Sequence, residues 1–263
     1  MPEDPRTLST LRATQVDPGP PWRPVVVRAE VDSTNAELVR DPEPWAVLVA
    51  ERQRAGRGRM GRSWVTTPGA SLAVSVVVPA VGMPLGWVPL VAGLALADAI
   101  TATAGVATGL KWPNDVLAPD DGERKLAGIL CEWTPRGIVV GTGVNVGHAR
   151  AELPLATATS VRAAGGEVTR EALLTAYLAH LAALVGDLAE DPPAVRERYA
   201  ARCLTLGATV VVHAPNEDRH GVAIGVDEEG RLGLDTATGR LWVSAGDVVH
   251  VRPANAPVPA PDC

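Results

Sequence analysis

Lysine is almost absent from this chain, so the positions that keep it are candidates for chemistry. The sequence has 22 arginines but only two lysines, Lys111 and Lys125. Abundant Arg, Ala, Gly, Pro and Val and the absence of Phe are typical of a GC-rich genome, which turns indifferent surface lysines into arginine. A compact ammonium that the planar guanidinium cannot replace is most often needed in a catalytic or small-molecule pocket. The two lysines therefore indicate a functional site, with leftover surface residues as the alternative.

A turn separates the two lysines and should bring charged groups together. The Pro-Asp-Asp-Gly sequence at 119–122 lies between the apolar runs KWPNDVL and KLAGILCEW, which predicts a hairpin. Folding the chain at this turn places Lys125 opposite Val116 and beside Asp115. Gly128 would leave space for a ligand against the strand. The alternative is a surface ion pair, which typically contributes under about 1 kcal/mol.

A second candidate site is the loop after the predicted strand at 45–51. Residues 52–64, RQRAGRGRMGRSW, contain five arginines and three glycines. Glycines let the backbone approach a ligand, and arginines direct charge at it. The Gly-Lys-Ser/Thr ending of a P-loop is absent, and no dinucleotide fingerprint follows. The pattern favours an anion-binding loop over a solvated connection or a nucleic-acid contact.

Two further segments carry weaker signals. Glycines at 141 and 143 lie within a predicted strand, where they cost stability unless another group must approach closely. The run at 32–37 predicts a helix start, in which Thr34 and Glu37 have capping-box spacing. An ordinary helix cap is the alternative reading of that run.

The elements that must position these residues follow a mixed order. Strands are predicted at 25–31, 45–51 and 71–78, a buried helix at 88–104, three consecutive strands from 111 to 146, and helices over 169–203. After 204–207 the chain changes to short strands split by turns, which predicts a small β-barrel. The fold class is α+β, with a mixed or antiparallel sheet and packed helices.

Composition limits the classes of function. The net charge of −6 argues against general binding to nucleic acid or membrane surfaces. The histidines lack metal-ligand spacing and the three cysteines form no CxxC pair, which fits a reduced cytoplasmic protein without structural zinc. The start MPEDPRT is not a signal peptide, and no uninterrupted apolar run reaches about 18 residues.

Five motifs in order along the chain resemble those of biotin protein ligases, the biotin–[acetyl-CoA-carboxylase] ligases. They are Asp32-Ser33-Thr34-Asn35, the run GRGRMGRSW at 56–64 preceded by Gln53, Lys111-Trp112-Pro113-Asn114-Asp115, Lys125-Leu126-Ala127-Gly128-Ile129 and Gly141-Thr142-Gly143-Val144-Asn145.

The resemblance implies a domain organisation. It comprises a flexible proline-rich arm at 1–24, a class II synthetase-like catalytic domain at 25–204, an SH3-like domain at 205–253 and a flexible tail at 254–263. Only 24 residues precede the first predicted strand, too few for the helix-turn-helix domain of ligases that double as repressors. We therefore expect a monofunctional ligase that does not bind DNA.

The same resemblance implies substrates and residue roles. Biotin and ATP would form biotinyl-5′-AMP, with Mg²⁺ expected on the triphosphate and its ligands left open, and biotin would then pass to a lysine of a biotin carboxyl carrier domain. The implied catalytic residues are Lys125, Arg59, Arg57 and Asp115. The implied biotin-binding residues are Ser33, Thr34, Asn35, Gln53, Gly56, Arg57, Gly58, Arg59, Lys125, Gly128 and Gly141. The implied ATP-binding residues are Arg59, Arg62, Trp64, Lys111, Asn114 and Asn145.

Two other functions remain open from the sequence. A lipoate or octanoate ligase or transferase would share the fold, although its pattern lacks the GRGRxGRxW loop. A nucleotide- or RNA-binding regulatory module would instead use the arginine loop together with the β module.

Overall fold

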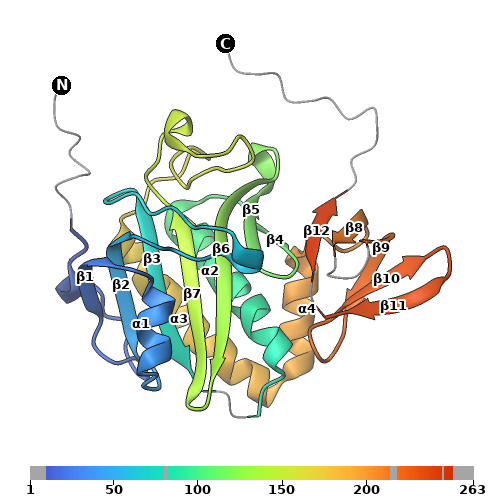
Figure 1. Cartoon of the computed structure of the whole chain (residues 1–263), viewed down its shortest axis with the longest axis horizontal. Coiled ribbons are helices and arrows are strands. Elements are labelled where there is room, and N and C mark those ends of the chain that lie inside the picture. Colours follow the sequence, from blue (N-terminus) through green and yellow to red (C-terminus); the bar gives the residue numbers. More distant parts are fainter. Residues whose placement is uncertain (1–9, 80–81, 214–217, 245, 251–263) are drawn as a thin grey trace.

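The computed structural model describes residues 10–79, 82–213, 218–244 and 246–250. It contains a seven-stranded sheet with helices on both faces and a separate five-stranded sheet at the C-terminal end (Figure 1). The predicted α+β class is confirmed, because the large sheet is mixed rather than wholly parallel.

The large sheet has the order β1-β2-β3-β7-β6-β5-β4. Its strands are β1 (Val26–Val31), β2 (Val47–Gln53), β3 (Ser71–Val78), β4 (Gly109–Lys111), β5 (Asp115–Ala118), β6 (Arg124–Thr134) and β7 (Gly137–Asn145). Only the β1–β2 pairing is parallel, and the other pairings are antiparallel. Every residue of β3 is buried, as expected for a central strand covered on both faces.

The prediction of one strand across KWPNDVL is wrong. The chain forms β4 up to Lys111, turns at 112–114, and starts β5 at Asp115, with β4 and β5 antiparallel. Pro113 has no N–H to give to the ladder and restricts the residue before it, so an uninterrupted strand is disfavoured there.

The predicted hairpin forms, but its register differs by one residue from the prediction. Lys125 pairs with Leu117 rather than with Val116, and beyond this pair the β5–β6 ladder has an irregularity between Val116 and Leu117. The bulge places Asp115 opposite Gly128. The expected meeting of Lys125 and Asp115 nevertheless occurs through the side chains.

The helices are α1 (Thr34–Arg40), α2 (Val88–Ala104), α3 (Arg170–Glu190) and α4 (Pro192–Arg202). α2 packs against the sheet and against α3 and α4, while α1 packs on β3 and β7 from the other face (Figure 1). The predicted capping role of Thr34 is wrong, since Ser33 is the N-cap and its hydroxyl accepts from the Ala36 N–H. The segments 85–104 and 170–190 are long and apolar enough to cross a bilayer, but core helices pass the same test of length and composition.

The N-terminal segment is packed rather than flexible over the residues that the structure describes. Leu11 and Trp22 are buried, and the Trp22 indole N–H donates to the Leu178 carbonyl at 2.8 Å. The prediction of a flexible arm is therefore wrong for residues 10–24. Apolar side chains along this proline-rich segment pack into the core. Residues 1–9 and the predicted tail at 254–263 lie outside the described residues.

The C-terminal sheet has the order β11-β10-β9-β8-β12. Its strands are β8 (Thr209–His213), β9 (Asp218–Val226), β10 (Leu232–Thr236), β11 (Gly239–Val243) and β12 (Asp247–His250). Two tryptophans of the large domain hold its β9–β10 turn: Trp87 donates to the Asp227 carbonyl at 2.9 Å and Trp112 to the Gly230 carbonyl at 3.0 Å. This attachment brings β12 to the edge of the cavity described next.

Candidate active site

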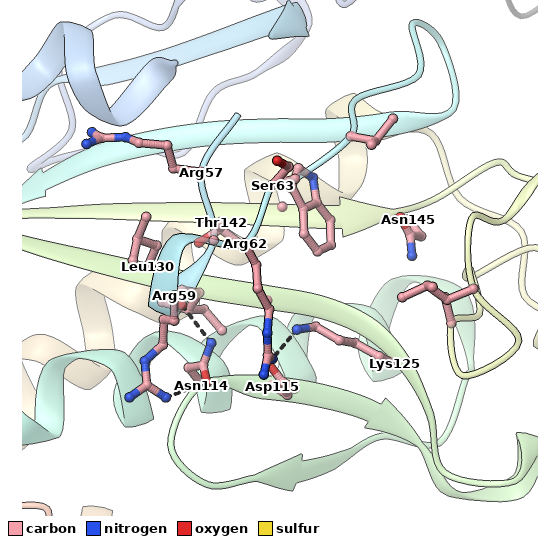
Figure 2. Close-up of a pocket in the computed structure, with 18 of the residues that line it drawn as sticks. Arg57, Arg59, Arg62, Ser63, Asn114, Asp115, Lys125, Leu130, Thr142 and Asn145 are labelled. Carbon is pink, nitrogen blue, oxygen red and sulfur yellow. Dashed lines mark hydrogen bonds and ion pairs between the residues drawn. The ribbon is translucent and has the colours of Figure 1, made fainter. Parts of the chain in front are cut away.

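A cavity of about 820 Å³ opens on the sheet face that carries α1. The loop after β2, the strands β5–β7, the segment after β7 and the end of β12 all contribute to its lining. Both lysines line it, as does every residue to which the resemblance gives a catalytic or binding role, except Gly56. Side chains that are far apart in the sequence thus converge on one site (Figure 2).

At one end of the cavity a chain of uncharged polar groups runs from α1 to the sheet. The Thr34 N–H donates to Gln53 Oε1 at 2.9 Å. The Ser75 hydroxyl lies 2.7 Å from the Thr34 hydroxyl and 2.6 Å from Asn35 Oδ1. Because the Asn35 amide oxygen can only accept, the Ser75 hydroxyl donates to it. The Thr34 hydroxyl donates to Gln53 Oε1 at 3.2 Å.

The side-chain amide of Asn35 is oriented by the two hydrogen bonds that its Nδ2 donates. Its Nδ2 donates to the Leu130 carbonyl at 3.0 Å and to Glu132 Oε2 at 2.8 Å. These two acceptors fix which end of the amide faces Ser75. Asn35 thereby holds α1 against β6, and its contribution to the pocket is a fixed polar wall.

Glu132 is a further residue of the site that the sequence motifs do not include. Its Oε2 accepts from Asn35 and also from Arg57 Nη2, at 2.9 Å. Arg57 therefore lies at the Asn35 end of the cavity, pointing away from Lys125 and Asp115 (Figure 2). A carboxylate within the otherwise apolar run KLAGILCEW was the available signal.

The glycines of β7 make room for protein side chains. Gly141, Gly143 and Asn145 share one face of the strand, as the two-residue period requires. A Cβ at Gly141 would overlap the Asn35 amide, and a Cβ at Gly143 would overlap the Trp64 indole. The glycines therefore let α1 and the arginine loop approach the sheet.

The arginine loop is closed by its own backbone. Trp64 N–H donates to the Gly56 carbonyl at 2.9 Å, and Gly58 N–H donates to the Arg62 carbonyl at 2.6 Å. Met60 and Gly61 at the tip have positive φ values of 54° and 75°. A Cβ at Gly56 would overlap the Trp64 carbonyl, so Gly56 serves the closure of the loop and does not line the cavity.

Cationic groups gather at the other end of the cavity. Lys125 Nζ lies 2.7 Å from Asp115 Oδ1 and 5.9 Å from the centroid of the Trp64 ring. A Cβ at Gly128 would lie 3.0 Å from Lys125 Nζ, so this glycine gives the ammonium its space. Lys111 is the cross-strand partner of Asp115, so both lysines neighbour the same residue, and Lys125 forms the ion pair with it.

Arg59 connects the loop with both sheets. Its Nη1 donates to Asn114 Oδ1 at 3.1 Å and to the Gly246 carbonyl at 3.3 Å. Asn114 in turn donates to the Ile129 carbonyl at 2.9 Å. Arg62 extends from the same loop toward the part of the cavity that holds Asp115 (Figure 2).

Two further stretches of the lining carry no signal in the sequence. They are His148, Glu152, Pro154, Leu155, Thr157 and Ala158 after β7, and Val248, Val249 and His250 of β12. Neither stretch contains a chemical motif, and only the packing of distant segments brings them to the cavity. Among the described residues, no group of three or more His, Cys, Asp or Glu could hold a metal ion.

Comparison with known proteins agrees with this geometry. Residues 28–148 match the Biotin/lipoate A/B protein ligase family, and residues 205–251 match the Biotin protein ligase C terminal domain. The fold is thus that of a ligase of the biotin/lipoate class.

Individual relatives narrow the class. The chain is 40% identical over 256 residues to the biotin–[acetyl-CoA-carboxylase] ligase of Mycobacterium tuberculosis, covering 92% of this chain and 95% of that one. It is 34% identical to the Paracoccus denitrificans ligase of the same name, covering 84% of this chain and 98% of that protein. The chain therefore belongs to the biotin protein ligase family.

A solved structure of the family has the same fold as this chain. The biotin protein ligase from Aquifex aeolicus in complex with biotin and ATP has a TM-score of 0.76 and 27% identity, covering 87% of this chain and 99% of that chain.

Proposed function

We infer that this chain is an ATP-dependent biotin protein ligase. The observation that carries the inference is one cavity in which uncharged polar side chains and the Glu132-paired Arg57 lie at the Asn35 end, and cationic groups around Lys125 lie at the other end. A bicyclic urea needs neutral hydrogen-bond partners, whereas a carboxylate and a triphosphate need cations. A cavity of about 820 Å³ is within the usual range for small-molecule sites.

The first half-reaction joins two anions. A biotin carboxylate oxygen attacks the α-phosphorus of ATP, the bond to the bridging oxygen breaks, and pyrophosphate leaves with the electron pair. Preorganised cations are the strongest aid to such a step, because they neutralise charge without reorganising. We assign Lys125 to the oxygens that link the acyl group and the phosphate, and Arg59 to the carboxylate and phosphate.

The remaining residues take supporting roles in this proposal. Ser33, Thr34, Asn35 and Gln53 would face the ureido group. Arg62 would reach the departing phosphates. Trp64, Asn145, Lys111 and Asn114 would line the nucleotide side. Arg57 would have to exchange the Glu132 carboxylate for that of biotin in order to act on it.

Magnesium fits this site as an ion that arrives with ATP. Mg²⁺ usually keeps several waters and takes one or two carboxylates plus substrate phosphates. The described residues provide no cluster for a dedicated metal cage. We propose that Mg²⁺ is held mainly by the triphosphate, where it would withdraw charge from the leaving group.

The second half-reaction transfers biotin to an amine. A lysine of a carrier domain attacks the acyl carbon, the bond to the phosphate oxygen breaks, and AMP leaves. We propose that Asp115 accepts the amine proton or orients the amine, because it lies in the cavity beside Lys125. We also propose a cytoplasmic location, supported by the free thiols of Cys131 and Cys203.

The assay that tests the proposed function is pyrophosphate release. ATP with biotin should release pyrophosphate, and ATP with lipoate should not. Pyrophosphate release with lipoate but not with biotin would identify the chain as a lipoate ligase. Release with neither, together with salt-dependent RNA binding, would favour a binding module.

Changing Asp115 to asparagine is expected to slow transfer from purified biotinyl-AMP to a carrier domain by about 100-fold, as loss of a general base does. The amide keeps the size of the carboxylate but binds a proton poorly. The control is Asp120→Asn, since Asp120 is exposed on the same hairpin and does not line the cavity. An unchanged transfer rate in the Asp115 variant would show that this carboxylate is not the base.

A further inference from the structure

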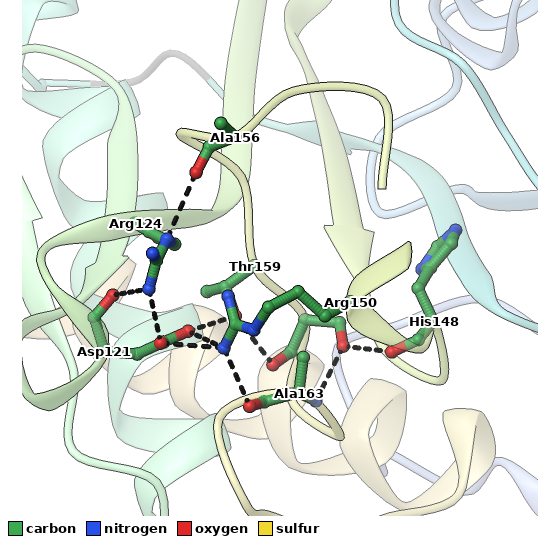
Figure 3. A network of polar contacts seen from close by, with 8 residues as sticks. Asp121, Arg124, His148, Arg150, Ala156, Thr159 and Ala163 are labelled. Carbon is green, nitrogen blue, oxygen red and sulfur yellow. Dashed lines mark hydrogen bonds and ion pairs between the residues drawn. The ribbon is translucent and has the colours of Figure 1, made fainter. Parts of the chain in front are cut away.

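Asp121 lies outside the cavity lining, yet it joins two segments that form the cavity. It is the last residue of the short 3-10 helix Pro119–Asp121 between β5 and β6, and its side chain is 16% exposed. Its Oδ1 accepts from Arg124 Nη1 at 2.8 Å and from Arg150 Nη2 at 2.7 Å. Its Oδ2 accepts from the Thr159 hydroxyl at 2.5 Å (Figure 3).

The two arginines extend this network to the segment 150–163. Arg124 Nε donates to the Ala156 carbonyl at 3.1 Å, and Arg150 Nη2 donates to the Ala163 carbonyl at 3.1 Å (Figure 3). The segment is thus attached at its beginning, middle and end. Between these attachments lie the cavity residues Pro154, Leu155, Thr157 and Ala158.

The same segment also sets the backbone of Lys125. Lys125 N–H donates to the Thr157 carbonyl at 2.8 Å, and Thr159 N–H donates to the Lys125 carbonyl at 2.9 Å. Asn145 Nδ2 donates to the Thr159 carbonyl at 2.9 Å. Thr159 therefore contacts Asp121 with its side chain while its backbone holds two residues of the site.

Asp121 is charged when it makes these contacts. Burial alone would raise the pKa of Asp121. The hydrogen bonds from Arg150 and Thr159 and the charges of Arg150 and Arg124 outweigh burial and lower it. The contacts are therefore charge-assisted, and such hydrogen bonds are stronger than neutral ones.

We propose that Asp121 is a positioning residue for adenylation, which sets the Lys125 backbone and the 154–158 wall of the cavity without touching a substrate. The inference rests on the proposed function. An ordered wall removes the entropy cost of arranging that segment when the nucleotide binds, which improves affinity without a new contact. The segment is hydrogen-bonded to the backbone of Lys125 and to the side chain of Asn145, so its effect falls on ATP rather than on the biotin head group.

The test is the Michaelis constant of each substrate in the pyrophosphate assay. Asp121→Asn keeps the shape of the side chain and removes its charge. It should raise KM for ATP about tenfold, the loss that follows from one charge-assisted hydrogen bond. KM for biotin should stay within about twofold, because the Asn35 end of the cavity is not attached to this network.

A pair of Thr159 variants tests the same proposal independently of the Asp121 substitution. Thr159→Val deletes the hydroxyl at constant shape and should raise KM for ATP, whereas Thr159→Ser keeps the hydroxyl and should resemble the wild type. These two variants carry the test if Asp121→Asn does not fold. Thr159 is buried and does not line the cavity.

The matched control is Asp227→Asn, which alters a similar carboxylate in the β9–β10 turn. Asp227 is 14% exposed and accepts from Arg231 Nε at 2.7 Å. This variant should lower the melting temperature without changing KM for ATP. The inference is overturned if the Asp121 and Thr159→Val variants behave like this control. A wild-type chain without biotin-dependent pyrophosphate release would overturn the proposed function and this inference together.

Discussion

Replacing Lys125 with arginine is expected to reduce biotin-dependent pyrophosphate release by about 100-fold or more, the usual loss when one preorganised electrostatic contact is removed. The ammonium occupies a narrow space between Asp115, the Trp64 ring and Gly128. A guanidinium keeps the charge but is planar and larger, so it would displace the indole or withdraw from the reacting oxygens.

The fold should survive this replacement, because the Lys125 side chain is 33% exposed and its backbone bonds do not depend on the side chain. Circular dichroism and thermal unfolding check the fold, and pyrophosphate release checks the chemistry. Lys111→Arg provides the comparison. Its loss of pyrophosphate release is expected to be smaller, since Lys111 lies on the short β4 strand. Normal turnover in both variants would mean that codon bias alone explains the scarcity of lysine.

Removing the charge of Glu51 is expected to give the largest loss of stability, about 3–5 kcal/mol in the free energy of unfolding. Glu51 and Arg170 form a two-point ion pair, with Nη1–Oε2 at 2.7 Å and Nη2–Oε1 at 3.1 Å. Their side chains are only 10% and 5% exposed. Glu51→Gln would leave a buried guanidinium at the first turn of α3, where the helix dipole already disfavours positive charge.

The same carboxylate also holds the N-terminal segment, since the Leu11 N–H donates to Glu51 Oε1 at 2.6 Å. Urea unfolding of Glu51→Gln measures the loss. The control is Glu30→Gln, which removes an exposed partner of Arg54 and should cost under about 1 kcal/mol. A loss for Glu51→Gln as small as that of the control would show that the buried pair adds no stability.

Local patterns predicted most of the elements, for a physical reason. Burial on one or both faces produces a periodicity that a short window contains, so the strand at 71–78 and the helix at 88–104 could be predicted to the residue. Two of the errors fell where a long-range contact outweighs a local preference. Leu11 and Trp22 pack on the core despite the prolines around them, and Ser33 rather than Thr34 caps α1 because Thr34 is bonded to Gln53 and Ser75.

The sequence by itself determined the chemistry that is available: two retained lysines, a glycine- and arginine-rich loop, and glycines at alternate positions of a strand. These signals are local, since they depend on residue type and spacing. Only the tertiary structure determined which side chains contact one another. It packs Asn35 and Trp64 against the β7 glycines and pairs Glu132 with Arg57. It also joins Asp121 by a hydrogen bond to Thr159, in the segment that holds Lys125. Such contacts join residues far apart in the chain, and no spacing within a short window encodes them.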